Sequence, residues 1–294
     1  MIALRTATVV IFAPPTAATV RPVRLIVRSC RLVVLLPFTL PALNVKIEKI
    51  YGYLYTPKRP LPKADRLALV KSFYGGANQF DPDIQLLCAA GIYVFSPSPR
   101  GVADRSAAFE KLNDRDMGGY EVVDVMYEGK YISELLGIPP SRIGVFGHSH
   151  GGYEVMRELT FPGKVGQVAF QFDGGFGISV AGFSSVEGQS EKSNIREWIT
   201  KEAGSERNQW KDRSPINHAD KLRGRLLLIH GTNDKRVPFA ESKALDDKLI
   251  ELGERDQVQL LALQEGGHVP ISTDELIAQY QAWFSFLNSQ DEGS

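Results

Sequence analysis

The sequence predicts an α/β protein with a mostly parallel central sheet that helices cover on both faces. Short apolar runs alternate with stretches of helical period along most of the chain. Strands that alternate with helices in this way imply a parallel sheet buried between helical layers. The chain has 294 residues, of which 43% are hydrophobic and 23% charged, so it can build one large α/β domain or two small ones.

The predicted elements begin at Val45, where the pattern becomes regular. Residues 55–57 are expected in a surface loop, and residues 174–215 are expected to be rich in loops, with a helix near 194–202. Strands are predicted at 45–55, 67–73, 92–95, 143–146, 165–172, 226–229 and 258–263. Helices are predicted at 82–90, 119–136, after residue 149, at 239–252 and at 274–287.

Residues 1–44 form an N-terminal segment of unclear role, and residues 45–294 form the predicted domain. No Asp or Glu occurs before Glu48, whereas arginine is frequent. The apolar run 32–43 is broken by two prolines and is shorter than the roughly 20 apolar residues of a membrane-spanning helix. A targeting segment, a weak signal peptide, extra edge strands and sequence outside the fold all remain open. We slightly favour strand or irregular packing, and a cytoplasmic location.

Charge and cysteine content exclude some classes of protein. Lys and Arg together number 34, as do Asp and Glu, so no net field attracts nucleic acid or an acidic membrane. No nucleic-acid partner and no membrane span are expected, whereas a homo-oligomer is left open. The two cysteines, Cys30 and Cys88, suggest no disulfide framework, and Cys88 is interpreted as a small buried hydrophobe in a helix.

The stretch around Ser149 carries the strongest chemical signal. The buried strand 143–146 runs into Gly147-His148-Ser149-His150-Gly151-Gly152, and a helical pattern follows. This is a G-x-S-x-G motif between a strand and a helix, where a sharp turn presents the serine beyond the sheet. Taken alone, the motif would fit an ordinary turn equally well.

Two further strand ends supply the partners that a nucleophilic serine needs. Asp234 follows the strand 226–229, and His268 follows the strand 258–263. The chain order Ser, Asp, His is that of the α/β-hydrolase fold. We expect Ser149 to attack, His268 to move the proton and Asp234 to orient the imidazole. The weaker alternatives are an Asx turn at Asp234 and Asp173 as the acid.

An oxyanion hole is expected beside this triad. The backbone N–H of His150 follows the nucleophile and is one predicted donor. The second is the hydroxyl of Tyr74 at the end of the strand 67–73, or the backbone at 75–76. The alternative for Tyr74 is an aromatic core residue.

Other polar and aromatic residues have simpler interpretations. His148 and His150 match no zinc-binding spacing, and the glycines at 174, 175 and 177 match no dinucleotide motif, so neither a metal nor a cofactor is expected. His230 is expected to be buried and hydrogen-bonded, and Arg100 to pair with a carboxylate. Four aromatic residues are assigned either to a substrate pocket or to ordinary packing: Phe176, Phe183, Trp198 and Trp210.

The motifs together resemble the prolyl oligopeptidase family of serine peptidases over roughly residues 45–290. The matching pieces are Phe73-Tyr74-Gly75-Gly76, Ser98-Pro99-Arg100-Gly101, Gly147 to Gly152, Ser214-Pro215-Ile216, Leu227 to Gly231 with Asp234 and Val237-Pro238, and Gly267-His268. The Gly-x-Ser-His-Gly-Gly form looks most like the acylaminoacyl-peptidase branch. The resemblance implies that a tyrosine placed as Tyr74 donates to the oxyanion.

The sequence departs from the family pattern in three places. The 44 residues before the predicted domain cannot hold a β-propeller, which needs several blades of about 40–45 residues. Arg225 stands where the family often has proline, before the strand that carries the Asp. No Glu pair for binding a free peptide amine can be identified.

The predicted function is therefore a cofactor-free serine hydrolase that cleaves a short peptide or a small ester through an acyl-enzyme. A carboxylesterase on the same scaffold is the alternative, and a non-catalytic binding protein is a remote one.

Overall fold

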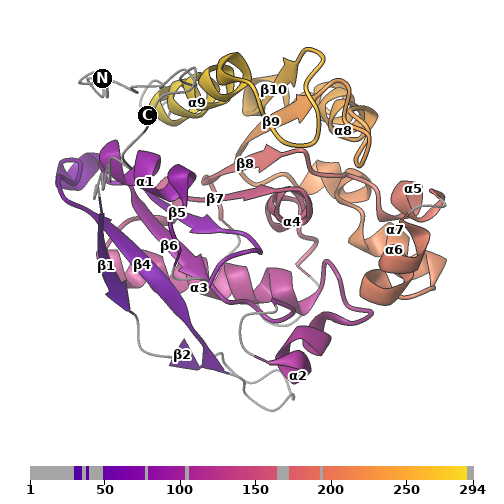
Figure 1. Ribbon diagram of the computed structural model, residues 1–294, viewed down its shortest axis with the longest axis horizontal. Helices are drawn as coiled ribbons and strands as arrows, with labels where there is room; N and C mark the ends of the chain where they lie inside the picture. The colour runs from indigo at the N-terminus through magenta and orange to yellow at the C-terminus, as the bar shows by residue number, and fades with distance from the viewer. Residues whose placement is uncertain are drawn as a thin grey trace, which may run out of the picture.

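The computed structural model describes residues 30–34, 38–39, 49–76, 79–102, 106–163, 172–192 and 195–289. Within these residues the strands form one eight-stranded sheet in the order β1-β4-β6-β5-β7-β8-β9-β10 (Figure 1). The pairs β1–β4 and β4–β6 are antiparallel, and the remaining neighbours are parallel. The strands are β1 Cys30–Val34, β4 Gly52–Pro57, β6 Tyr93–Pro97, β5 Ala68–Lys71, β7 Ile143–His148, β8 Phe176–Val180, β9 Arg225–Gly231 and β10 Val258–Leu263. The short strands β2 Phe38–Thr39 and β3 Lys49–Ile50 pair with each other.

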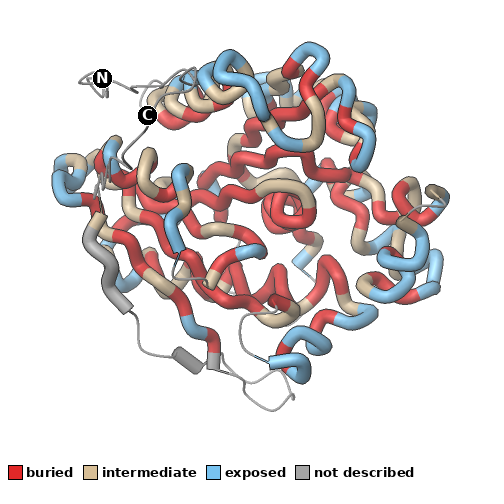
Figure 2. Tube along the Cα trace, in the orientation of Figure 1, coloured by how far each residue is buried: buried red, intermediate tan, exposed pale blue. Residues whose placement is uncertain are grey.

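Helices cover both faces of the sheet, as predicted for an α/β-hydrolase fold. On one face lie α1 Pro82–Ala89 and α9 Thr273–Asn288, and on the other lie α3 Tyr120–Leu136, α4 His150–Leu159 and α8 Ala240–Glu251. Successive strand residues contribute to opposite layers: Leu226 and Leu228 pack under α3, α4 and α8, whereas Leu227 and Ile229 pack under α1 and α9. The central strands β5, β6, β7, β8 and β9 are consequently buried along almost their whole length (Figure 2).

Smaller helices complete the described chain. After β8 come α5 Val186–Ser190, α6 Arg196–Ala203 and α7 Arg207–Arg213, and α2 Ala107–Glu110 follows β6. The 3-10 helices are η1 Lys63–Asp65, η2 Lys111–Asn113, η3 Pro140–Arg142, η4 Pro215–Lys221 and η5 Arg255–Gln257. Among the described helices, none is both long and apolar enough to cross a lipid bilayer.

Two predictions about the middle of the chain were wrong. Residues 55–57 belong to β4 rather than to a loop. The segment 174–215 is not mainly loop, because it holds β8 and three helices, of which α6 Arg196–Ala203 confirms the helix predicted near 194–202. Most of the strand predicted at 165–172 lies outside the described residues. The glycine within β8, Gly177, weakened the strand pattern in the sequence. A Cβ on Gly177 would lie 2.6 Å from Leu159 and 2.7 Å from Val155, so this glycine marks close packing against α4.

Cys88 is buried in a helix, α1, as predicted, but the expectation that the cysteines form no disulfide was wrong. The structure pairs Cys30 with Cys88 in a disulfide, with the two Cα atoms 5.5 Å apart. This disulfide links β1, at the edge of the sheet, to α1. The partners are separated by 58 residues in the chain, so their spacing gives no local signal of pairing.

The disulfide yields the first prediction. Denatured, unreduced protein should contain no thiol that reacts with Ellman's reagent, and reduction should release both. Because the bond closes a long loop, reduction should lower the stability by roughly 2–4 kcal/mol, measured as a fall in Tm. Free thiols in freshly purified, unreduced protein would contradict the pairing.

Candidate active site

The turn between β7 and α4 holds Ser149 in a strained conformation. Its backbone has φ 58° and ψ −114°, a region that residues with side chains rarely adopt, and its N–H donates to the Val180 carbonyl at 2.8 Å. A Cβ on Gly147 would lie 2.5 Å from the Gly151 backbone, so the strand and the helix approach as closely as glycine allows. Ser149 therefore projects beyond the carboxyl end of β7.

The structure brings Ser149, His268 and Asp234 together in one hydrogen-bonded chain. His268 Nε2 lies 2.9 Å from Ser149 Oγ, and His268 Nδ1 lies 2.7 Å from Asp234 Oδ2. Asp234 stands just beyond β9 and His268 beyond β10, at the same edge of the sheet as Ser149. Three parallel strands of one sheet, β7, β9 and β10, thus deliver all three side chains to one place.

Asp234 is held as a carboxylate. Burial opposes its ionisation, but contacts with His230 and His268, together with N–H groups of Val237 and Arg236, hold the pKa of Asp234 well below its usual range. His230 is fully buried, as expected, and its Nε2 lies 3.3 Å from Asp234 Oδ2. Its Nδ1 lies 2.7 Å from Ser242 Oγ, so the ring is fixed from both sides.

Both groups predicted for the oxyanion hole lie next to Ser149. His150 is the first residue of α4, and an N–H in the first turn of a helix has no acceptor within the helix. Tyr74 lines the same cavity as Ser149 and is half-exposed. Partial burial, and then the nearby carboxylates of Glu154 and Glu202, raise the pKa of Tyr74, so its hydroxyl keeps its proton. The alternative donor at Gly76 is occupied, because that N–H donates to Ser96 Oγ.

A cavity of about 430 Å³ opens beside Ser149. It is lined by Tyr74, Ser149, His150, Phe183, Gln189, Ile195, Trp198, Arg236, Val237 and His268. The four aromatic residues that the sequence left undecided therefore fall into two groups. Phe183 and Trp198 line the cavity, whereas Phe176 is buried in the core and Trp210 packs on the cluster behind.

Other residues singled out in the sequence have structural partners. Asp173, the alternative acid, lies 3.2 Å from Arg223 and is not part of the chain around Ser149. Arg100 forms a two-pronged ion pair with Asp124, as predicted. His148 contacts the carbonyl of His268 at 2.7 Å through Nε2.

A group of carboxyl side chains buried on α3 and α4 was not predicted from the sequence. All are fully buried and come from α3 or α4: Glu121, Asp124, Glu128, Glu154 and Glu158. The sequence did contain a signal of this group: the acidic residues recur every three or four positions, on the faces of the two helices that are otherwise apolar.

Glu158 is the clearest case of a carboxyl that keeps its proton. Burial raises the pKa of Glu158 to about 8, against the effect of a hydrogen bond with Ser72. The Ser72 hydroxyl lies 2.7 and 2.8 Å from the two carboxyl oxygens. A hydroxyl has one proton to donate, so the second short contact suits a carboxyl that donates its own.

Comparison with known proteins agrees with the fold and with the predicted resemblance. A model of the prolyl oligopeptidase family matches residues 78–292. The uncharacterized peptidase YuxL of Bacillus subtilis is 27% identical over 220 residues, which are 71% of this chain and 32% of YuxL. The uncharacterized peptidase YtmA of the same organism is 29% identical over 168 residues, 55% of this chain and 60% of YtmA. The chain thus spans about a third of the length of one relative and 60% of the other.

A solved structure gives the same fold. The uncomplexed acylaminoacyl peptidase of Pyrococcus horikoshii superimposes with a TM-score of 0.73 at 22% identity, covering 88% of this chain and 41% of that protein. The α/β-hydrolase fold predicted from the sequence is therefore confirmed.

The buried carboxyl of Glu158 leads to a prediction about pH. Below its ordinary pKa of 4.5 the group is protonated whether the chain is folded or not. Between that pH and about 8 the unfolded chain releases the proton and the folded chain keeps it, so stability falls as pH rises. Glu158→Gln has nothing to titrate and should remove this contribution. Between pH 5 and pH 8 its free energy of unfolding should rise relative to that of the parent by on the order of a few kcal/mol, measured as a growing difference in Tm.

The exposed Glu134→Gln on α3 is the matched control for this measurement, and its Tm should follow the parent at every pH. Parallel Tm curves for Glu158→Gln and the parent would mean that Glu158 ionises normally in the folded protein.

Proposed function

Because this chain belongs to the prolyl oligopeptidase family of serine peptidases, we propose that Ser149, His268 and Asp234 are the catalytic triad of a serine hydrolase. The observation that carries the proposal is their hydrogen-bonded chain, with contacts of 2.9 and 2.7 Å, which ends in the cavity. The substrate is a small acyl compound, and the reaction passes through an acyl-enzyme on Ser149.

The first step is attack of Ser149 Oγ on the substrate carbonyl carbon. With the proton of its imidazole on Nδ1, facing Asp234, His268 presents the lone pair of Nε2 to the serine hydroxyl and accepts its proton. The carboxylate of Asp234 then stabilises the imidazolium that forms. Its lowered pKa suits this role, because it stays ionised while His268 gains charge.

The negative charge of the tetrahedral intermediate develops on the former carbonyl oxygen. The N–H of His150, at the positive end of the dipole of α4, and the hydroxyl of Tyr74 are the proposed donors to this oxygen. Collapse of the intermediate releases an amine or an alcohol, which takes the proton back from His268. Water then attacks the acyl-enzyme by the same route and releases the carboxylic acid.

The cavity supports a substrate with an apolar side chain or acyl group. Its volume of about 430 Å³ is in the range of small-molecule pockets, and Phe183, Trp198 and Ile195 contribute apolar surface. The guanidinium of Arg236 adds hydrogen-bond donors that suit the carbonyl oxygens of a short peptide, whereas the amide of Gln189 is already hydrogen-bonded to Glu241 and Lys192. We favour a short peptide for this reason, with a small carboxylic ester as the alternative.

Partners and location stay predictions: a small substrate, no nucleic acid, no membrane span, a homo-oligomer left open, and the cytoplasm. The disulfide between Cys30 and Cys88 argues against the cytoplasm, because such bonds persist mainly in oxidising compartments.

The proposed function is tested by a paired assay on the purified protein. One arm offers p-nitrophenyl esters of short and medium acyl chains, and the other offers free and N-acylated aminoacyl p-nitroanilides of matched size. Anilide cleavage is expected, and Ser149→Ala should lower turnover at least ~10³-fold without a change in Tm. Ester turnover alone would favour the carboxylesterase.

Labelling of Ser149 by a fluorophosphonate probe separates an enzyme from a binding protein. The wild-type chain should be labelled and Ser149→Ala should not. An unlabelled wild-type chain that turns over neither substrate class would overturn the proposal.

A further prediction concerns Tyr74. Tyr74→Phe removes the proposed hydroxyl donor and keeps the ring, so kcat should fall by about 10²-fold while KM changes little. Tyr51→Phe, at an exposed tyrosine outside the cavity, is the control and should leave kcat unchanged. An unaltered kcat in Tyr74→Phe would remove this hydroxyl from the mechanism.

A further inference from the structure

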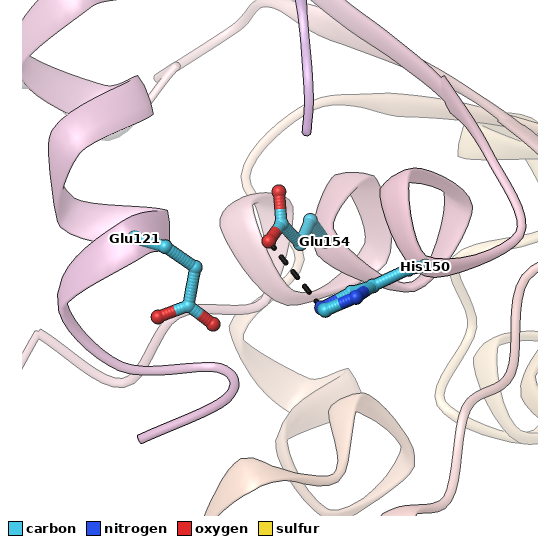
Figure 3. A group of neighbouring side chains, drawn as sticks. All are labelled: Glu121, His150 and Glu154. Carbon is cyan, nitrogen blue, oxygen red and sulfur yellow. Dashed lines mark ion pairs between the residues drawn. The ribbon is translucent and has the colours of Figure 1, made fainter. Parts of the chain in front are cut away.

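Three side chains of unlike type meet behind the nucleophile. His150 and Glu154 lie one turn apart on α4, and Glu121 reaches them from the first turn of α3 (Figure 3). One donor atom from each, an imidazole nitrogen or a carboxylate oxygen, lies within 4.8 Å of the other two. All three residues are buried.

Two of these side chains have polar atoms without a hydrogen-bond partner. Among the described residues, His150 Nε2 and both carboxyl oxygens of Glu154 are buried and unpaired. Glu154 is 0% exposed and His150 3% exposed, and the closest approach between them, Nε2 to Oε1, is 3.6 Å. Burying polar atoms without a hydrogen-bond partner is unfavourable, so a bound group that satisfies them would stabilise the fold.

Among the residues that the structure describes, no Lys or Arg side chain pairs with Glu154. Within the described part of the chain, its one ion-pair contact is with His150. Two guanidinium groups of this region contact other groups: Arg157 contacts Asp212 and the Gly118 carbonyl, and Arg213 contacts Asp116 and Asp212. Both keep buried N–H groups without a hydrogen-bond partner among the described residues, and neither pairs with Glu154 there. Three further buried carboxyl groups on α3 and α4 raise the pKa of Glu154 or lie near it: Asp124, Glu128 and Glu158. Arg157 is the buried base on α4.

The carboxyls therefore need either protons or a cation. Burial, and then the neighbouring carboxylates, raise the pKa of Glu154 well above its usual range. Burial also lowers the pKa of His150 to about 3, so its imidazole is neutral and offers a lone pair.

We propose that His150 Nε2 and the carboxylates of Glu154 and Glu121 bind a divalent transition-metal cation, Zn²⁺ or Mn²⁺. Two carboxylates and a neutral imidazole balance its charge, and this mixture of nitrogen and oxygen donors suits both ions. Around a tetrahedral ion with bonds of ~2.0–2.2 Å, ligand atoms stand roughly 3.3–3.6 Å apart. The His150 and Glu154 atoms already have this spacing, at 3.6 Å.

Glu121 completes the set from the other helix. Its two oxygens accept hydrogen bonds from the N–H groups of Gly118 and Gly119, which orient the carboxylate and leave each oxygen a further lone pair. The cation thus sits nearest His150 and Glu154, and joins the first turn of α3 to the first two turns of α4.

The cavity beside Ser149 provides a route to this site. The ring of His150 lines that cavity, stacks on Phe73 at 4.0 Å between centroids, and has Glu154 one turn deeper. A cation that enters from the cavity meets the imidazole first. A bound ion would also fix the residue whose N–H is proposed for the oxyanion hole. That consequence rests on the proposed function, whereas binding itself does not.

The test is a titration of chelator-treated full-length protein with Zn²⁺ and with Mn²⁺, followed by calorimetry, by metal analysis after dialysis and by Tm. Binding of one ion per chain and a rise in Tm with metal concentration are expected. Glu154→Gln keeps the size of the side chain and should weaken binding at least ~10-fold. Ca²⁺, which prefers all-oxygen sites, should raise Tm less.

Glu158→Gln is the matched control, because Glu158 is an equally buried carboxyl one turn further along α4. It does not belong to the proposed ligand set of Glu121, His150 and Glu154. It should keep the affinity of the parent. Equal affinity in the parent, Glu154→Gln and Glu158→Gln, or no binding by the parent, would overturn the proposal and leave protons to neutralise the carboxyls. Glu121→Gln is a second variant, interpreted only if circular dichroism shows that it folds.

The same titration on Ser149→Ala keeps this proposal separate from the proposed function. Ion binding should persist in that variant, whether or not the wild-type chain cleaves either substrate class.

Discussion

The structure depends on how closely α4 approaches the sheet behind Ser149. A Cβ on Gly147 would lie 2.5 Å from the Gly151 backbone, and one on Gly151 would lie 2.5 Å from the Ser72 carbonyl. This contact forces the strained backbone of Ser149 and aims the first turn of α4 at the cavity. The edge of the sheet that presents the serine is also the edge reached by Asp234 and His268. One steric constraint therefore positions the nucleophile, the proposed oxyanion donor and the hydrogen-bonded chain together.

The residues around this contact show which features a sequence can reveal. Ser149, Asp234 and His268 each follow a short apolar strand, and the chain order of their residue types restricts the topology. The strand 258–263 was predicted with its observed bounds, because an apolar run interrupted only by Gln259 lies between polar residues. The elbow and its partners could be predicted because their signals are local: glycines at a turn and polar residues at strand ends.

What the sequence did not reveal depends on contacts between distant segments. β8 contains Gly177, which weakens the strand pattern but is required where α4 packs on the sheet. Cys30 and Cys88 meet because β1 lies at the edge beside α1, and nothing near either cysteine indicates it. Glu121 and Glu154 occupy the apolar faces of their helices, and polar residues at such positions are ordinarily assigned to solvent. Only the packing of α3 against α4 removes them from water.

The charge of the buried carboxyl groups affects the proposed chemistry at Ser149. Glu154 lies one turn along the helix whose first N–H is proposed to stabilise an oxyanion, and Glu121 and Glu158 lie close by. If these groups were ionised and uncompensated, their negative charge would oppose both the helix dipole and the charge that develops beside Ser149. A serine hydrolase with this arrangement therefore functions best when the cluster is neutral. At Glu158 a proton neutralises the carboxyl group, which is hydrogen-bonded to the Ser72 hydroxyl. At Glu154 no hydroxyl fills that role among the described residues, and the neutral imidazole of His150 faces it instead, which favours a cation there.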